Sequence, residues 1–193
     1  LLTGHLQTIM SWGPLRITLD DKGYVSLYFG EVGVITSKEP IISANWYTIN
    51  VELWRDQKTV LYIRDNLTGK EEQTYTESHQ RGINLGEFES AKIRVATDES
   101  KTEFFNGKIE APEIEADGKI ILKYDFSRQI PLFEVPAESG PPLLLHNSPT
   151  RAVKGMKWDA SEFCWRHRPE HYAAIHFHED DIYEFNWEYD FEL

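Results

Sequence analysis

The sequence predicts an all-β protein, an antiparallel sandwich or jelly roll built from eight or more short strands. Through about residue 126, apolar and polar residues alternate, which is the pattern of a strand with one buried face. Turn residues recur at fairly regular intervals, and no long segment shows the period of a helix. The length of 193 residues suits one domain with a substantial core.

The first half of the chain predicts two hairpins, each made of two alternating stretches around a polar turn. The first hairpin joins residues 15–19 to residues 25–29 through the turn at residues 20–23. The second joins residues 47–53 to residues 60–63 through the turn at residues 55–58. The polar, aperiodic residues 69–82 that follow predict a long solvated loop.

The second half predicts fewer and shorter strands. Ile93 and Val95 mark one strand, and residues 120–126 mark another. The dipeptides Asn106-Gly107 and Asp117-Gly118 predict tight turns, because these residues tolerate positive φ. Residues 131–142 predict a connector, and beyond it the chain is rich in aromatic residues with weak periodicity.

The apolar positions of these strands predict the core of the sandwich. The predicted core residues are Ile17, Leu27, Ile49, Val51, Leu53, Ile93, Leu122 and Tyr124.

Composition excludes several classes of partner. A net charge of −12 and a sequence pI near 5.0 disfavour nucleic acid and anionic membrane surfaces, which attract basic patches. The single cysteine, Cys164, excludes an internal disulfide framework, and no apolar run reaches the length of a membrane span. We expect a cytoplasmic protein. The chain begins at Leu1 without a methionine, and we expect it to be part of a larger protein.

A cluster of histidines and acids near the end of the chain indicates a metal site as one hypothesis. On a strand, His176 and His178 would project to one face roughly 6.5–7 Å apart, close enough to share a cation. Glu184 could complete the ligand set. The alternative is that Asp180 and Asp181 hydrogen-bond the two imidazoles, which raises their pKa and disfavours metal binding.

The last residues indicate a second hypothesis, a glycoside hydrolase. Glu188, Asp190 and Glu192 form a Glu-x-Asp-x-Glu ladder, the arrangement that laminarinase-type retaining enzymes place on a jelly-roll strand. Such enzymes need two carboxyl groups about 5–5.5 Å apart. Alternating acids on a solvated strand explain the same residues.

A third hypothesis rests on several phrases that occur in order between residues 123 and 189. These are residues 123–128, 147–155, 169–172 and 174–181, with Trp158, Trp165 and Trp187 between and after them. Together they resemble the large subunit of N,N-dimethylformamidase and its relatives. Residues 1–122 fit more loosely, through Trp46-Tyr47 and residues 105–109, which are similar to phrases of a concanavalin-like or laminin-G-like jelly roll.

The resemblance implies how the chain is organised. It implies a jelly-roll core over residues 1–142 and a family-specific segment over residues 143–193 that packs on it or completes it. The downstream catalytic domain or other subunits would be its partners. Candidate residues for such an interface, or for binding, are Trp158, Trp165, His176, His178, Asp180, Asp181 and Trp187.

The resemblance also implies an activity for the larger protein. Its relatives hydrolyse the amide bond of small N-substituted formamides with a mononuclear iron, held by tyrosine, glutamate and histidine in a later domain. No catalytic residue, metal ligand or cofactor is then expected in this chain, whose role would be assembly and support. Carbohydrate binding is the competing function, with a sugar as partner, because folds of this kind also host lectins and glycosidases.

Overall fold

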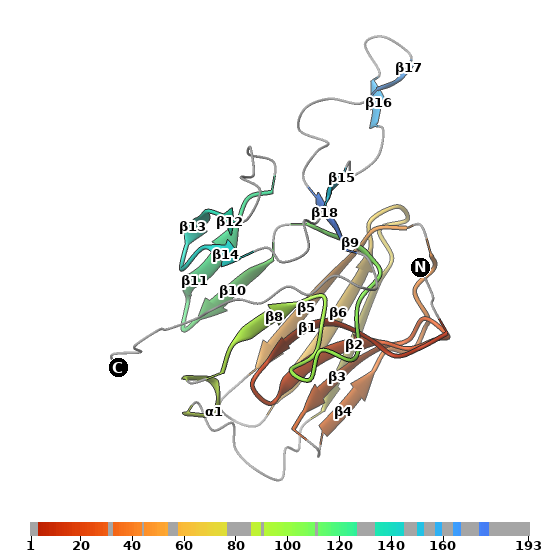
Figure 1. Ribbon diagram of the computed structural model, residues 1–193. Coiled ribbons are helices and arrows are strands. Elements are labelled where there is room, and N and C mark those ends of the chain that lie inside the picture. The colour runs from red at the N-terminus through yellow and green to blue at the C-terminus, as the bar shows by residue number, and fades with distance from the viewer. Residues whose placement is uncertain are drawn as a thin grey trace. The chain divides into compact units, whose positions relative to one another are not determined.

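The computed structural model describes twelve segments of the chain, and their regular secondary structure is almost entirely β-strand (Figure 1). The described residues are 4–30, 33–43, 45–53, 58–76, 86–89, 91–110, 112–126, 134–144, 150–152, 157–159, 164–166 and 174–177. Within them the strands pair in antiparallel sheets and one helical turn is present, α1 (Gly86–Glu89). The all-β prediction is confirmed. Jelly-roll connectivity stays a prediction.

The chain forms two compact units, one holding strands β1 to β8 and the other holding β9 to β18. The predicted division between residues 142 and 143 stays a prediction. None of the described helices is long and apolar enough to span a membrane.

The first unit contains a five-stranded sheet in the order β4-β3-β2-β1-β8. Its strands are β1 (Gln7–Trp12), β2 (Leu15–Leu19), β3 (Val25–Phe29), β4 (Gly33–Thr36) and β8 (Ile93–Val95). The predicted first hairpin and the predicted strand at Ile93 and Val95 are therefore confirmed.

The sequence pattern did not predict β1, the strand that lies between β2 and β8. Its register shifts between Thr8 and Met10, which indicates a β-bulge. A bulge inserts one extra residue, so that the alternation of buried and exposed positions is interrupted. Gln7 and Thr8 precede the bulge and are both buried, because they lie on opposite faces of the sheet and both faces are covered there.

The second sheet of this unit has the order β5-β6-β7, with β5 (Tyr47–Leu53), β6 (Thr59–Asp65) and β7 (Glu71–Thr76). The second predicted hairpin is confirmed by the pairing of β5 with β6. The prediction of a solvated loop over residues 69–82 is wrong for residues 71–76, which form β7. In this edge strand, exposed Glu71 and Gln73 alternate with half-buried Glu72 and Thr74, so a polar sequence still pairs as a strand.

The two faces of the five-stranded sheet differ in chemistry. One face carries apolar residues from every strand and forms the core, while the second sheet lies behind it in Figure 1. Backbone N–H groups of Lys38 and Glu39, just after β4, donate to the Glu72 carboxylate of β7 and join the edges of the two sheets. The register assigns to the apolar face Trp12, Leu15, Ile17, Leu19, Val25, Leu27, Phe29, Ile35, Ile93 and Val95.

The helical turn α1 extends this apolar face. The rings of Phe88 and Trp12 meet edge to face with centroids 4.7 Å apart, and Trp12 Nε1 donates to the Phe88 carbonyl at 3.1 Å. The turn between β1 and β2 requires glycine beside α1. Gly13 has φ +53, and a Cβ there would lie 2.7 Å from the Glu87 carbonyl oxygen.

The second unit contains small sheets joined by short connections. Its strands are β9 (Gly107–Glu110), β10 (Glu113–Ala116), β11 (Lys119–Tyr124), β12 (Glu134–Val135), β13 (Ala137–Ser139), β14 (Leu143–Leu144), β15 (Thr150–Ala152), β16 (Lys157–Asp159), β17 (Cys164–Arg166) and β18 (Ala174–Phe177). The sheets have the orders β10-β11-β13, β12-β14, β15-β18-β9 and β16-β17.

Two predicted turns in this unit have different outcomes. Asp117 and Gly118, with φ of 48° and 77°, connect β10 to β11 as predicted, since a two-residue hairpin turn favours positive φ at both positions. The turn at Asn106-Gly107 is wrong, because Gly107 is the first residue of β9 and pairs with Phe177. The predicted connector at residues 131–142 contains β12 and β13.

Half of the predicted core is fully buried. Leu27, Ile93, Leu122 and Tyr124 are each at most 1% exposed. Ile17, Ile49, Val51 and Leu53 are only half-buried. The last three belong to β5, an edge strand, and Ile17 pairs with Met10, where the register of β1 shifts.

Candidate functional site

Two of the phrases that carry the family resemblance, residues 147–155 and 174–181, contribute strands to one small sheet. Strand β18, which contains His176, lies between β15 and β9 (Figure 1). His176 is opposite Thr150 on one side and opposite Lys108 on the other. Residues that are far apart in the sequence are thus joined by backbone pairing.

Lys108 is the cross-strand neighbour of His176 in β9. A metal-ligand role for His176 stays a prediction.

Several predicted site residues lie outside the described residues. They are His178, Asp180, Asp181, Glu184, Trp187, Glu188, Asp190 and Glu192. The metal and glycosidase hypotheses therefore stay predictions. Within the described ranges, no group of three His, Cys, Asp or Glu residues could hold a metal ion.

The two other predicted interface residues are paired with each other. Strands β16 and β17 form a two-stranded sheet in which Trp158 is opposite Trp165. Their role in binding or at an interface stays a prediction.

Tyr124, in the first family-like phrase, is a structural anchor of the second unit. Its ring is fully buried and stacks on Phe126 with centroids 6.2 Å apart. Its hydroxyl donates to the Pro141 carbonyl at 2.8 Å, which fixes the segment after β13. Burial raises the pKa of Tyr124 well above its usual value, so the hydroxyl stays protonated as a donor.

The second face of the five-stranded sheet carries polar side chains, yet its centre is buried. The register assigns to it Thr8, Ser11, Arg16, Thr18, Ser26, Tyr28 and Arg94. Arg16 and Tyr28 are half-buried, and the other five are buried. The segment after β8 crosses this face in Figure 1.

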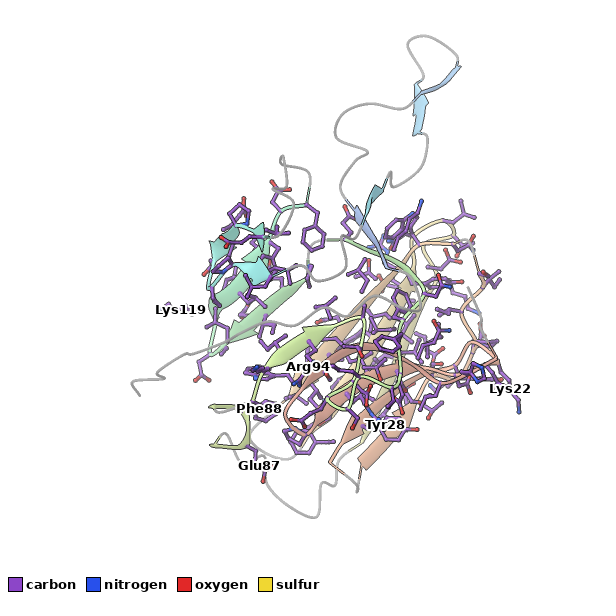
Figure 2. All side chains as sticks on the ribbon, in the orientation of Figure 1. Lys22, Tyr28, Glu87, Phe88, Arg94 and Lys119 are labelled. Carbon is purple, nitrogen blue, oxygen red and sulfur yellow. The ribbon has the colours of Figure 1, made fainter. Side chains whose placement is uncertain are left out.

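Glu103, in that segment, accepts three hydrogen bonds from two side chains of the polar face. Its carboxylate accepts two hydrogen bonds from Arg16 Nη1, at 3.1 and 3.0 Å, and one from Thr8 Oγ1 at 2.7 Å. The Arg16 guanidinium also lies 4.9 Å from the centre of the Tyr28 ring. Figure 2 labels Tyr28, a residue of β3. We call Thr8, Arg16, Tyr28 and Glu103 the Arg16–Glu103 cluster.

Asp98 shapes the loop that presents Glu103. Its carboxylate accepts hydrogen bonds from the backbone N–H groups of Ser100, Thr102 and Glu103 at 3.1, 2.7 and 2.8 Å. Burial acts to raise the pKa of Asp98, but these hydrogen bonds outweigh burial and hold the pKa below its usual value. The carboxylate is therefore ionised at neutral pH and rigidly held.

Sequence reasoning missed this polar face. The alternation of residues 15–19 assigns Arg16 and Thr18 to the solvent side of a strand. No local feature of the sequence indicates that Glu103, 87 residues away, binds Arg16. Asp98, followed by Ser100 and Thr102, carried the signal of a side-chain-stabilised turn.

The described structure thus defines an all-β protein whose buried charged groups mostly hold its own strands and loops. In sequence it is similar to beta subunits of N,N-dimethylformamidase. The protein of that name from Alcaligenes sp is 32% identical over 114 residues, covering 46% of this chain and 15% of that protein. The one from Paracoccus aminophilus is 22% identical over 224 aligned positions, covering 94% of this chain and 29% of that protein.

These relatives confirm the predicted resemblance. The chain spans less than a third of the length of either beta subunit. No family model matches the sequence, and no solved structure matches it.

Proposed function

We propose that this chain is a non-catalytic β-sandwich portion of a dimethylformamidase-like amidohydrolase that serves assembly and support. The larger protein would hydrolyse small N-substituted amides in the cytoplasm. The other subunits, or a catalytic region elsewhere in the larger protein, would be the partners of this chain.

The observation that carries the proposal is that buried and half-buried charged and polar groups bind other groups of the same unit. Glu103 binds Arg16 and Thr8, Asp98 binds its own loop, and the Tyr124 hydroxyl binds Pro141. A catalytic acid, base or nucleophile needs a free position from which to reach a substrate. Groups that already make such contacts within the protein favour a structural role for this chain.

Aromatic contacts favour this proposal over carbohydrate binding. Trp12 packs on Phe88, Phe29 lies 6.0 Å from Phe88, and Tyr124 stacks on Phe126. A sugar-binding platform needs an aromatic ring whose face is open to solvent. Phe88, Tyr124 and Phe126 are buried, and Trp12 and Phe29 are half-buried against Phe88.

We assign no iron ligand to the described residues. Tyr124 donates its hydroxyl proton to a carbonyl group. This arrangement does not suit a cation, which requires neutral imidazole or anionic oxygen donors. We propose that any iron of the larger protein is bound elsewhere.

An activity assay tests the proposal. The full-length natural protein, supplied with iron, should hydrolyse N,N-dimethylformamide, whereas the isolated chain should hydrolyse neither this amide nor a β-glucan. Release of dimethylamine and of reducing sugar measures the two reactions. Turnover by the chain alone that Glu188→Gln abolishes would support the glycosidase hypothesis instead.

Metal analysis of the isolated chain, purified without a histidine tag, tests the metal hypothesis. The proposal expects no stoichiometric transition metal. About one equivalent of zinc, iron or nickel that is lost when both His176 and His178 are changed to Ala would restore the metal site.

A further inference from the structure

Asn106 immediately precedes β9 and is followed by Gly107, the first residue of that strand. The chain contains seven asparagines, and Asn106 is the one that precedes a glycine. The other six precede tryptophan, valine, leucine or serine. The backbone nitrogen that follows an asparagine can attack the side-chain amide. Glycine hinders this approach least, because it has no Cβ.

Packing explains why glycine occupies position 107. The Phe105 ring lies against this glycine, and a Cβ at Gly107 would be 2.5 Å from Phe105 Cζ. A larger residue would therefore displace the ring. The packing of Phe105 thus keeps beside Asn106 the residue that leaves its side-chain amide most open to attack.

The surroundings of Asn106 allow the reaction in the folded protein. Asn106 is half-buried and lies outside the strands, so that water reaches it. Gly107 is opposite Phe177 in β18, and this pairing restrains the glycine nitrogen. The restraint is weakest at this position, because the ends of an element open locally at a lower free energy than its centre. We therefore expect the folded protein to react more slowly than the unfolded chain, but to react.

We propose that Asn106 is a site of spontaneous deamidation. The Gly107 nitrogen forms a bond to Asn106 Cγ and gives up its proton, the C–N bond of the side-chain amide breaks, and ammonia leaves with that proton. Water then opens the resulting succinimide ring at one of its two carbonyl groups. The products are aspartate and isoaspartate at this position, and water is the one co-reactant. The inference does not depend on amide hydrolysis by the larger protein.

The isoaspartate product changes the backbone ahead of β9. Its main chain runs through the side-chain carbon, which adds one methylene group between Phe105 and Gly107. Strand β9 pairs with β18 through Gly107 with Phe177 and through Lys108 with His176. We expect the added methylene group to weaken this pairing at its end. The aspartate product adds the same negative charge but leaves the backbone length unchanged.

Peptide mapping of the full-length natural protein, after incubation at pH 8, tests the site. Trypsin cleaves after lysine and arginine, which places Asn106 in peptide 102–108 and Asn66 in peptide 65–70. Asn66 is the internal control, because it is exposed in the turn between β6 and β7 but is followed by leucine. We expect peptide 102–108 to gain the mass of replacing NH2 by OH, as two isomers that chromatography separates, while peptide 65–70 stays unchanged. The rate should fall at pH 6, because the attacking nitrogen must lose its proton.

Two variants make the test specific. Asn106→Gln should give no product in peptide 102–108 over the same period, because its longer side chain would have to close a larger ring. Asn106→Asp carries the charge of the products without the added methylene group. In hydrogen exchange, the incubated natural protein should lose protection in β9, whereas freshly purified Asn106→Asp should keep it. An equal loss in this variant would contradict the backbone effect.

Two results would overturn the modification site itself. One is the absence of product in peptide 102–108 of the folded protein over a period in which the protein unfolded in guanidinium chloride is converted, since the pairing with Phe177 would then block the reaction. The other is equal conversion of peptides 102–108 and 65–70, which would show that Gly107 confers no advantage on Asn106.

Discussion

The two faces of the five-stranded sheet are built by different means. The apolar face is stabilised by side chains that alternate along each strand and exclude water together. The polar face is buried as well at its centre, but it depends on a few directed hydrogen bonds from one loop. Burial therefore follows from sequence pattern on the first face and from a distant partner on the second.

The largest expected effect comes from the apolar face. Leu27 is 1% exposed, so Leu27→Ala should lower the free energy of unfolding by about 2–5 kcal/mol through lost burial and the cavity left behind. Ile42→Ala is the control, because Ile42 is 63% exposed and its change should be nearly neutral. Urea unfolding measures both. Equal midpoints would mean that the assignment of faces is wrong.

The next effect comes from the Arg16–Glu103 cluster. Glu103→Ala leaves Arg16 and Thr8 without their acceptor, and we expect a loss of about 1.5–3 kcal/mol, as for hydrogen bonds to a charged group. Glu99→Ala is the comparison from the same loop, and we expect a smaller loss because the Glu99 side chain is mostly exposed and lies 4.0 Å from its partner, Arg94 Nη1. If the two variants unfold at the same urea concentration, the cluster does not hold the polar face.

A smaller effect, dependent on pH, is expected from Asp98. Its pKa is lower in the folded than in the unfolded protein, so its contribution to stability is present above the unfolded pKa of about 4 and is lost as the pH falls through the lower folded pKa. Asp98→Asn should cost about 1 kcal/mol at pH 7, where a charged acceptor becomes neutral. The difference from the natural protein should shrink below pH 4. A difference that is constant from pH 7 to pH 3 would exclude this role.

The smallest effect is expected from the exposed ion pair between Lys70 and Glu39. This pair raises the pKa of Lys70 through a hydrogen bond to Glu39, but both side chains are largely in water. Exposed ion pairs contribute little to stability because solvent and salt screen them. Lys70→Met should therefore unfold like the natural protein at physiological salt. A clear loss of stability would show that an exposed ion pair contributes as much to the free energy of unfolding as the hydrogen bonds of the polar face.

The comparison also explains what the sequence could predict. Both early hairpins follow from alternation, and Asp117-Gly118 follows from turn chemistry, because each signal is local. Strand β1 was missed because a bulge breaks its alternation, and β7 because an edge strand can be polar throughout. The pairing of Glu103 with Arg16 has no local signal, since it exists only when the loop held by Asp98 covers the sheet.

The most direct test of a supporting role measures stability and activity in one variant. In the full-length natural protein, Glu103→Ala should lower Tm while the kcat/KM for N,N-dimethylformamide per folded molecule stays unchanged, because Glu103 holds a sheet and touches no substrate. An unchanged Tm with a kcat/KM that falls tenfold or more, about 1.4 kcal/mol or greater in transition-state stabilisation, would contradict the account.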